Sequence, residues 1–151
     1  IVISGIHHSF HAIELGLIAL TGFNTLLPIW AVANFAQGGA ALAVYFKTKN
    51  KKMKAISLPA AISCTMGITE AAIFGVNLRY RKPFIGAAIG GAAAGAYVVF
   101  THVKMTAVGV TALPAIAITT ADTMVNYCIG LVIAGAVAFI ATWIMGIKEE
   151  A

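Results

Sequence analysis

The chain has 151 residues, of which 60% are hydrophobic and 10% are charged, with a mean hydropathy of +0.93. This composition excludes an ordinary water-soluble domain and indicates a protein whose solvent is lipid. The formal charge of +5 does not indicate a nucleic-acid partner, because the basic residues lie in short clusters between apolar runs. The chain begins without methionine and without a signal-peptide pattern, so we expect a piece of a longer protein.

The first 25 residues are too polar to form a lipid-facing span. They contain His7, His8, His11, Glu14 and Asn24. The following run, 26–46, is almost wholly apolar and long enough to cross the hydrocarbon core, so it predicts a first transmembrane helix with Trp30 near its entry. Five lysines lie within residues 47–54, which places this loop in the cytoplasm by the positive-inside rule.

Residues 55–78 are apolar but interrupted by Pro59, Gly67 and Gly75, and a second basic cluster follows at 79–82. Basic clusters on both sides of one apolar stretch indicate that the chain enters the membrane and returns to the side it came from. Non-helical backbone at membrane depth is tolerated only where protein or a water-filled cavity surrounds it. The pattern therefore predicts a re-entrant hairpin whose tip borders a cavity, with Glu70 facing that cavity.

The rest of the chain predicts two more spans. Residues 83–101 carry small residues at four-residue spacing, which is typical of a helix that packs closely on another helix. Residues 105–121, with Gly109 and Pro114, predict a second re-entrant or broken segment, and residues 124–147 predict a third span. The expected fold is an all-α membrane protein with about three transmembrane helices and two re-entrant or broken helical hairpins.

Glu70 is the strongest candidate for a functional residue. An ionisable group within an apolar membrane segment costs several kcal/mol and is a functional candidate by default. A buried carboxylate can accept hydrogen bonds from sugar hydroxyls, or take a proton from a hydroxyl that attacks phosphorus. The alternative is a structural ion pair with Arg79 or Arg81.

The histidines of the first segment offer a second polar group. His8 and His11 are three residues apart and can share one helix face, but no third ligand has convincing metal-site spacing. Contact with a substrate and a structural contact are both open for His8, and Glu14 is placed to pair with His11.

The remaining polar residues of the apolar runs are better explained by structure. Interhelical hydrogen bonding is the favoured interpretation for Asn34, Gln37 and Asn77. Cys64 and Cys128 lack the spacing of a disulfide framework or a zinc site, and no phosphate-binding glycine motif is present. No cofactor is expected.

Two motifs together resemble a known family. Residues 67–78, GITEAAIFGVNL, resemble the GITEP-type signature of membrane domain C in the glucose superfamily of phosphoenolpyruvate-dependent sugar phosphotransferase permeases. Residues 5–14, GIHHSFHAIE, resemble the paired-histidine motif of that family, and LPIW at 27–30 and AQGG at 36–39 favour its sucrose branch. The likeness extends over essentially the whole chain.

The resemblance implies a site for a sugar. The chain, 1–151, would be the sugar-binding part of domain C in a homodimeric, multi-pass protein of the bacterial inner membrane. Glu70 would contact sugar hydroxyls and serve the transfer step, and His7 or His8 would face the sugar. Thr69 and Asn77, from the same signature, complete the expected site. Ala71 stands where many relatives carry proline, so we expect a less rigid turn after Glu70.

The resemblance also implies partners. In the family, phosphate passes from phosphoenolpyruvate through carrier proteins to a cysteine on cytoplasmic domain B, and from there to the sugar. Neither Cys64 nor Cys128 has the context of that cysteine, so this chain alone is not expected to phosphorylate anything. Sucrose is the favoured substrate, with trehalose, a β-glucoside or N-acetylmuramic acid as alternatives.

Two other functions remain open at this point. One is an ion-coupled secondary transporter, in which Glu70 and His7 relay protons. The other is a scaffold or dimer interface built on the small-residue helix at 83–101. A purely structural module would not need an acid at position 70.

Overall fold

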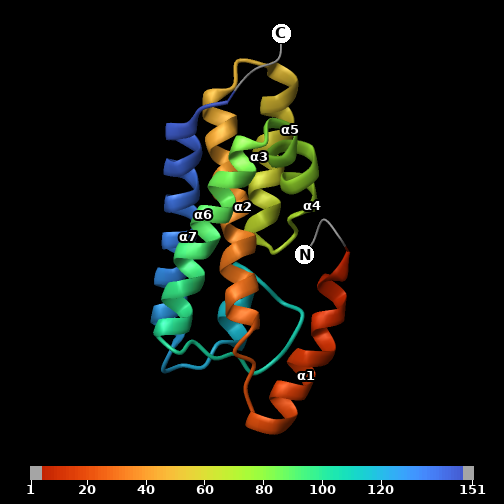
Figure 1. Ribbon diagram of the computed structural model, residues 1–151, viewed down its shortest axis with the longest axis vertical. Coiled ribbons are helices and arrows are strands. Elements are labelled where there is room, and N and C mark those ends of the chain that lie inside the picture. The colour runs from red at the N-terminus through yellow and green to blue at the C-terminus, as the bar shows by residue number, and fades with distance from the viewer. Residues whose placement is uncertain (1–4, 148–151) are drawn as a thin grey trace.

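The computed structural model describes residues 5–147, apart from the side chain of His7, and these residues form a bundle of helices of unequal length (Figure 1). In chain order the elements are η1 (Ile6–Ser9), α1 (Phe10–Thr21), α2 (Leu27–Lys47), α3 (Lys51–Thr65), α4 (Glu70–Ala72), η2 (Ile73–Asn77), α5 (Leu78–Tyr80), α6 (Lys82–Phe100), η3 (Leu113–Ile118) and α7 (Met124–Met145). Among them α2, α6 and α7 are long and apolar enough to cross a membrane. The three predicted spans are thus confirmed.

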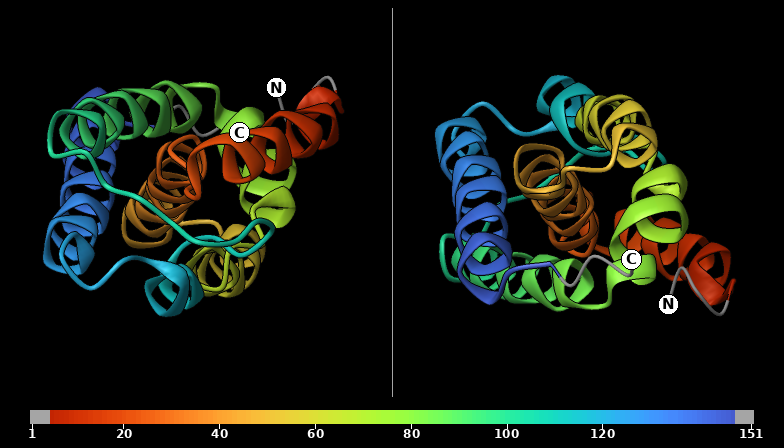
Figure 2. Two further views of the ribbon diagram at one scale, coloured as in Figure 1. Left: turned by 90° about the horizontal axis from the view of Figure 1, so that it is seen from below. Right: turned by 90° about the horizontal axis from the view of Figure 1, so that it is seen from above.

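Helix α2 lies at the centre of the bundle, with α6 and α7 on one side and the α3 hairpin on the other (Figure 2). Its start is fixed by Asn24, whose side-chain oxygen accepts hydrogen bonds of 3.0 Å from the backbone amides of Leu26 and Leu27. The core around α2 consists largely of alanines, such as the fully buried Ala31, Ala36 and Ala40. Small side chains let the helices approach closely without a hydrophobic force between them.

The contact between α6 and α7 confirms the prediction made from the glycine spacing. A Cβ atom added at Gly90 would lie 2.6 Å from the Cβ of Ala138, and one added at Gly86 would lie 2.2 Å from Oγ1 of Thr142. No larger residue fits at either position without a shift of the helices.

The first re-entrant hairpin has the predicted form. Helix α3 runs inward from the basic loop, and the chain turns at 66–69 and returns through α4, η2 and α5, which form one continuous helical arm with a π-helical turn in its middle (Figure 1). Both ends of the hairpin lie at the same end of the bundle, and its tip lies near mid-height.

The second broken segment is not a helical hairpin. Between α6 and α7 the chain is extended apart from the short η3, and it climbs from the end of the bundle opposite the basic loops to the level of the hairpin tip (Figure 1). Threonines replace helical hydrogen bonds there: the hydroxyl of Thr106 donates to Ile118 O at 3.1 Å, and that of Thr119 donates to Ala115 O at 2.8 Å. Threonine hydroxyls that bond to nearby backbone groups compete with a helix.

The basic clusters gather at one end of the molecule, as the positive-inside rule predicted. Lys82 Nζ donates to Met145 O at 2.8 Å, and Lys47 Nζ donates to Trp143 O. Both lysines thereby bond carbonyl groups at the carboxyl end of α7, where a helix lacks internal partners and carries partial negative charge.

Candidate functional site

Segments from four parts of the chain line a cavity of about 230 Å³ near mid-height of the bundle. Charged, polar and aromatic side chains share its wall. They come from the first segment (His8, Phe10, His11, Glu14), from α2 (Leu27, Trp30, Asn34), from the hairpin tip (Gly67, Thr69, Glu70) and from the second re-entrant segment (Gly109, Thr111). The prediction of a cavity at the tip that Glu70 faces is therefore confirmed.

The hairpin tip places Glu70 at this cavity. Helix α3 ends at Thr65, and Gly67 turns the chain with a φ of +89°, a conformation that favours glycine. The amides of Gly67 and Ile68 donate back to Cys64 O and Ser63 O at 3.0 and 3.1 Å. Glu70 then opens α4 as an exposed residue, whereas Thr69 beside it is buried.

Glu70 has no ion-pair partner among residues 5–147. The structural alternative considered from the sequence, an ion pair with Arg79 or Arg81, is not formed. The carboxylate is thus available to a ligand in the cavity.

The histidine side of the cavity has a fixed geometry. The ring centroids of His8 and His11 lie 5.7 Å apart, so the two imidazoles share one face of the first segment, as predicted. Nδ1 of His11 lies 3.0 Å from Oε2 of Glu14. Glu14 is 1% exposed although it is an acid, and its pairing with His11 was predicted from their spacing. When the carboxylate accepts the proton on Nδ1, the neutral imidazole keeps Nε2 as an acceptor.

Aromatic rings form the apolar part of the wall. Phe10 and Trp30 meet edge to face with ring centroids 5.2 Å apart. The indole nitrogen of Trp30 is buried and has no hydrogen-bond partner within the described part of the chain. Because this nitrogen is itself buried, Trp30 contributes ring surface to the wall and not an accessible N–H group.

Three of the predicted site residues, His8, Thr69 and Glu70, thus meet at one cavity. The side chain of His7 lies outside the residues that the structure describes. Asn77 is not brought to the cavity: it is fully buried in η2, and its amide donates to Gln37 O at 3.0 Å and to Gln37 Oε1 at 2.8 Å. This is the interhelical bonding favoured for Asn77 and Gln37 on chemical grounds.

Sequence reasoning missed several residues of the wall. His11 and Glu14 were assigned only to each other, Trp30 only to the membrane boundary, and Asn34 to helix packing. Thr111 was not singled out from the many threonines around it. The one usable signal was that His11 follows His8 by one helical turn, which places both on the same face.

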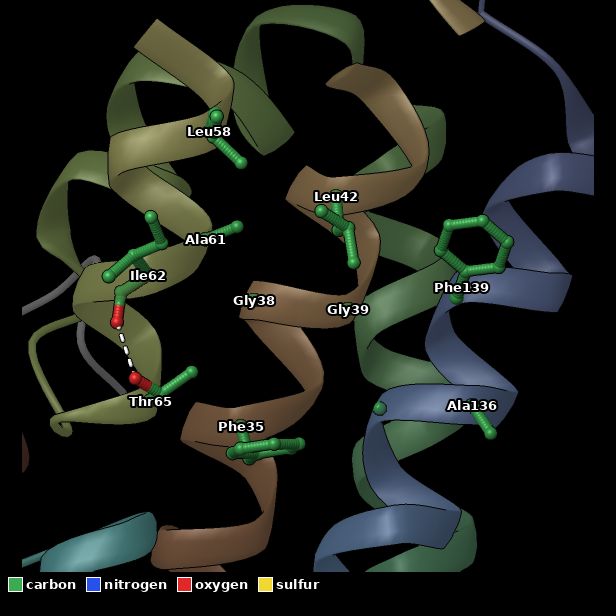
Figure 3. Close-up of a pocket in the computed structure, with 11 residues that line it drawn as sticks. Phe35, Gly38, Gly39, Leu42, Leu58, Ala61, Ile62, Thr65, Ala136 and Phe139 are labelled. Atoms are coloured by element: carbon green, nitrogen blue, oxygen red, sulfur yellow. Dashed lines mark hydrogen bonds between the residues drawn. The ribbon is translucent and has the colours of Figure 1, made fainter. Parts of the chain in front are cut away.

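A second cavity, of about 350 Å³, lies between α2, α3 and α7 (Figure 3). Its wall is apolar, with Ile62 of α3 on one side, Phe139 of α7 on the other, and Phe35, Gly38 and Gly39 of α2 between them. Its one hydroxyl, that of Thr65, donates to Ile62 O at 2.7 Å. This cavity offers no charge and no free hydrogen-bonding group for a sugar.

Comparison with known proteins finds relatives over the whole length of the chain. The family described as "Phosphotransferase system, EIIC" matches residues 1–91. The chain is 62% identical over its full length to a sucrose-specific EIIBC component of Salmonella typhimurium, covering 34% of that protein. It is 60% identical over 99% of its length to a sucrose-specific EIIBC component of Bacillus subtilis, covering 33% of it.

A more distant relative has another sugar in its name. The chain is 42% identical over 99% of its length to a beta-glucoside-specific EIIBCA component of Bacillus subtilis, covering 25% of it. The chain spans about a third of the length of the two sucrose-specific relatives named above. No solved structure matches it significantly.

Proposed function

Because this chain belongs to the phosphotransferase system EIIC family, an integral membrane family, we propose that it is the part of a sugar permease that binds sucrose during transport coupled to phosphorylation. The observation that carries the proposal is the meeting of Glu70, Thr69, His8 and His11 at one cavity near mid-height of the bundle. The names of the sucrose-specific relatives support the choice of sugar.

The wall of the cavity has the chemistry that a disaccharide requires. A sugar presents many hydroxyls, each of which donates and accepts, together with less polar ring faces. Glu70 accepts from hydroxyls, and Phe10 and Trp30 cover apolar surface. Sites of this mixed kind bind small molecules through many apolar contacts and a few placed polar groups.

Glu70 has a second role in the proposal. Group transfer requires that one sugar hydroxyl lose its proton as it attacks phosphorus, and a carboxylate within hydrogen-bonding reach accepts that proton. The oxygen then forms the bond to phosphorus, and the bond from phosphorus to the cysteine sulfur of the donor breaks. Holding the hydroxyl in line with the donor supplies much of the rate.

The donor lies outside the described residues. Cys64 is fully buried against α2, and Cys128 lies within the α7 span, so neither is open to a soluble carrier. We propose that phosphate arrives on a cysteine of cytoplasmic domain B, loaded by carrier proteins. We further propose that the complete permease is a homodimer and that the sugar site reaches the cytoplasmic side by movement of the hairpin and its neighbours together.

The test uses the complete permease in membrane vesicles supplied with phosphoenolpyruvate and the carrier proteins. We expect Glu70→Gln to lower the rate of sucrose phosphorylation by at least about a hundredfold, the range reported for loss of a general base. His8→Ala should raise KM for sucrose. Asp122→Asn, which changes an exposed acid at the opposite end of the bundle, is the matched control. Wild-type activity in Glu70→Gln would contradict the proposed role.

The same vesicles separate the alternatives. Uptake of unmodified sucrose without phosphoenolpyruvate would indicate an ion-coupled transporter instead. The beta-glucoside-specific relative makes a β-glucoside the second candidate substrate, and competition by an aryl β-glucoside with labelled sucrose measures the preference. Specificity between two disaccharides rests on few polar contacts, so modest differences in the wall decide it.

A further inference from the structure

The two re-entrant segments and α2 are joined by a chain of hydrogen bonds at the wall of the cavity. Nδ2 of Asn34 lies 3.1 Å from Oγ1 of Thr111, and Oγ1 of Thr111 lies 3.5 Å from the carbonyl oxygen of Gly67. Asn34 belongs to α2, Thr111 to the second re-entrant segment and Gly67 to the hairpin tip. All three residues line the cavity that contains Glu70.

The hydrogen bonds from Asn34 through Thr111 to Gly67 have a defined direction. A carbonyl oxygen can only accept, so the single proton of the Thr111 hydroxyl points to Gly67. The hydroxyl oxygen then accepts from the amide of Asn34. The second bond is long and therefore weak, but the contact around it is tight: a Cβ added to Gly67 would lie 2.3 Å from Oγ1 of Thr111.

The tip has little else to hold it. Within residues 5–147, the other hydrogen bonds of the tip residues 66–69 lead to residues of the same hairpin. The side chains of Met66 and Ile68 are 60% and 59% exposed, and of the four tip residues only Thr69 is buried, so packing holds the turn at one side chain. The bond from Thr111 is thus the hydrogen bond that ties the tip to the rest of the bundle.

Thr111 itself is firmly placed. The next residue, Ala112, is fully buried, and its carbonyl accepts a 2.7 Å hydrogen bond from the hydroxyl of Tyr127 in α7. Asn34 lies in the central span. The chain of bonds therefore runs from two spanning helices to a turn that has few contacts of its own.

We infer that Thr111 and Asn34 are positioning residues, which hold the hairpin tip and thereby set the place of Glu70, three residues beyond Gly67, in the sugar site. The inference rests on the proposed function, because it concerns how the proposed sugar ligand is oriented. It assigns no sugar contact to Thr111 or Asn34. Their effect passes through the backbone of the tip.

The first experiment measures KM for sucrose in vesicles that contain the complete permease. Thr111→Val keeps the shape of the side chain and removes both bonds, and we expect it to raise KM by about fivefold, the loss typical of one neutral hydrogen bond. Thr111→Ser keeps the hydroxyl and should stay near wild type. Asn34→Leu removes only the first bond and should give an intermediate KM. Thr106→Val, which removes an exposed hydroxyl from the same segment, is the control.

The second experiment measures hydrogen exchange of the tip amides, 66–69, without sugar. We expect faster exchange in Thr111→Val than in Thr111→Ser or Thr106→Val. Wild-type KM together with wild-type exchange in Thr111→Val would overturn the inference. Failure of the proposed function gives a different result, namely wild-type sucrose phosphorylation in Glu70→Gln while the tip still exchanges faster in Thr111→Val.

Discussion

At the scale of single residues, the cavity is lined by two acids in opposite surroundings. Glu14 is buried and its carboxylate contacts Nδ1 of His11, whereas Glu70 is exposed and has no ion-pair partner in the described part of the chain. The two acids have similar chemistry and opposite surroundings. Those surroundings support the different roles proposed for them.

The pairing of Glu14 with His11 leads to a prediction for sugar affinity. Glu14→Gln keeps an oxygen that accepts from Nδ1, so KM for sucrose should stay within about twofold of wild type. Glu14→Leu leaves Nδ1 without an acceptor, lets the ring turn, and should raise KM by about fivefold. Kinetics in vesicles measure both variants. Equal KM values for the two would show that the orientation of His11 has no part in binding.

The site could be predicted from the sequence only in part. Glu70 was identifiable because an acid in an apolar stretch is costly, and the histidine pair because two imidazoles stand close together. Asn34 and Thr111 are 77 residues apart, and nothing in their local sequence indicates that they bond. Trp30 was interpreted as a boundary residue because tryptophan is common at membrane interfaces. Contacts between distant segments depend on the packing of helices, which a single sequence does not specify.

At the scale of elements, the spans were predictable and the second re-entrant segment was only partly so. The ends of the three spans agree with the apolar runs within about two residues, because crossing hydrocarbon fixes their length. For residues 105–121 the prediction left a re-entrant or a broken segment open, and the structure shows a broken one with the single short helix η3. Gly109 adopts a positive φ, Pro114 lies at the start of the short η3, and the backbone groups are satisfied by threonine hydroxyls and by neighbouring loops.

Two glycines of the re-entrant segments offer a matched test of how closely the segments meet. Gly67 and Gly109 both line the cavity and both have positive φ values, +89° and +94°. A Cβ atom added at Gly67 would lie 2.3 Å from Oγ1 of Thr111, whereas one added at Gly109 would have no neighbouring atom within 4 Å. Both alanine variants carry about 1 kcal/mol of backbone strain, and Gly67→Ala carries a steric penalty in addition.

We therefore expect Gly67→Ala to lower the thermal unfolding temperature of the purified permease more than Gly109→Ala does. It should also raise KM for sucrose, because the tip must move. Identical effects of the two substitutions would mean that the contact between the re-entrant segments is loose.

At the scale of the whole molecule, charge and packing agree on one orientation. The loop at 47–54, the cluster at 79–82 and the carboxyl end of α7 all lie at one end, joined by Lys47 and Lys82. His102 and Lys104 lie at the other end. The positive-inside rule places the first end in the cytoplasm.

This orientation is tested by labelling single cysteines in whole cells, in a background where Cys64, Cys128 and every other cysteine of the complete permease are replaced by alanine. A membrane-impermeant thiol reagent should label His102→Cys and Thr106→Cys from outside. It should label Asn50→Cys and Arg81→Cys only after the cells are opened. All four positions are exposed in the bundle, so access alone decides the outcome. Labelling of Asn50→Cys in intact cells would reverse the orientation.

The meeting of two segments that enter from opposite ends has an electrical consequence. The hairpin enters from the end with the basic loops and the second segment from the other end, and they meet where the hydroxyl of Thr111 lies 3.5 Å from the carbonyl oxygen of Gly67. A charge that crosses the full potential gains or loses about 2.3 kcal/mol per 100 mV. The hairpin tip that carries Glu70 lies near mid-height of the bundle, so a movement of the tip along the membrane normal would change the electrostatic energy of the carboxylate by the fraction of the potential that it crosses.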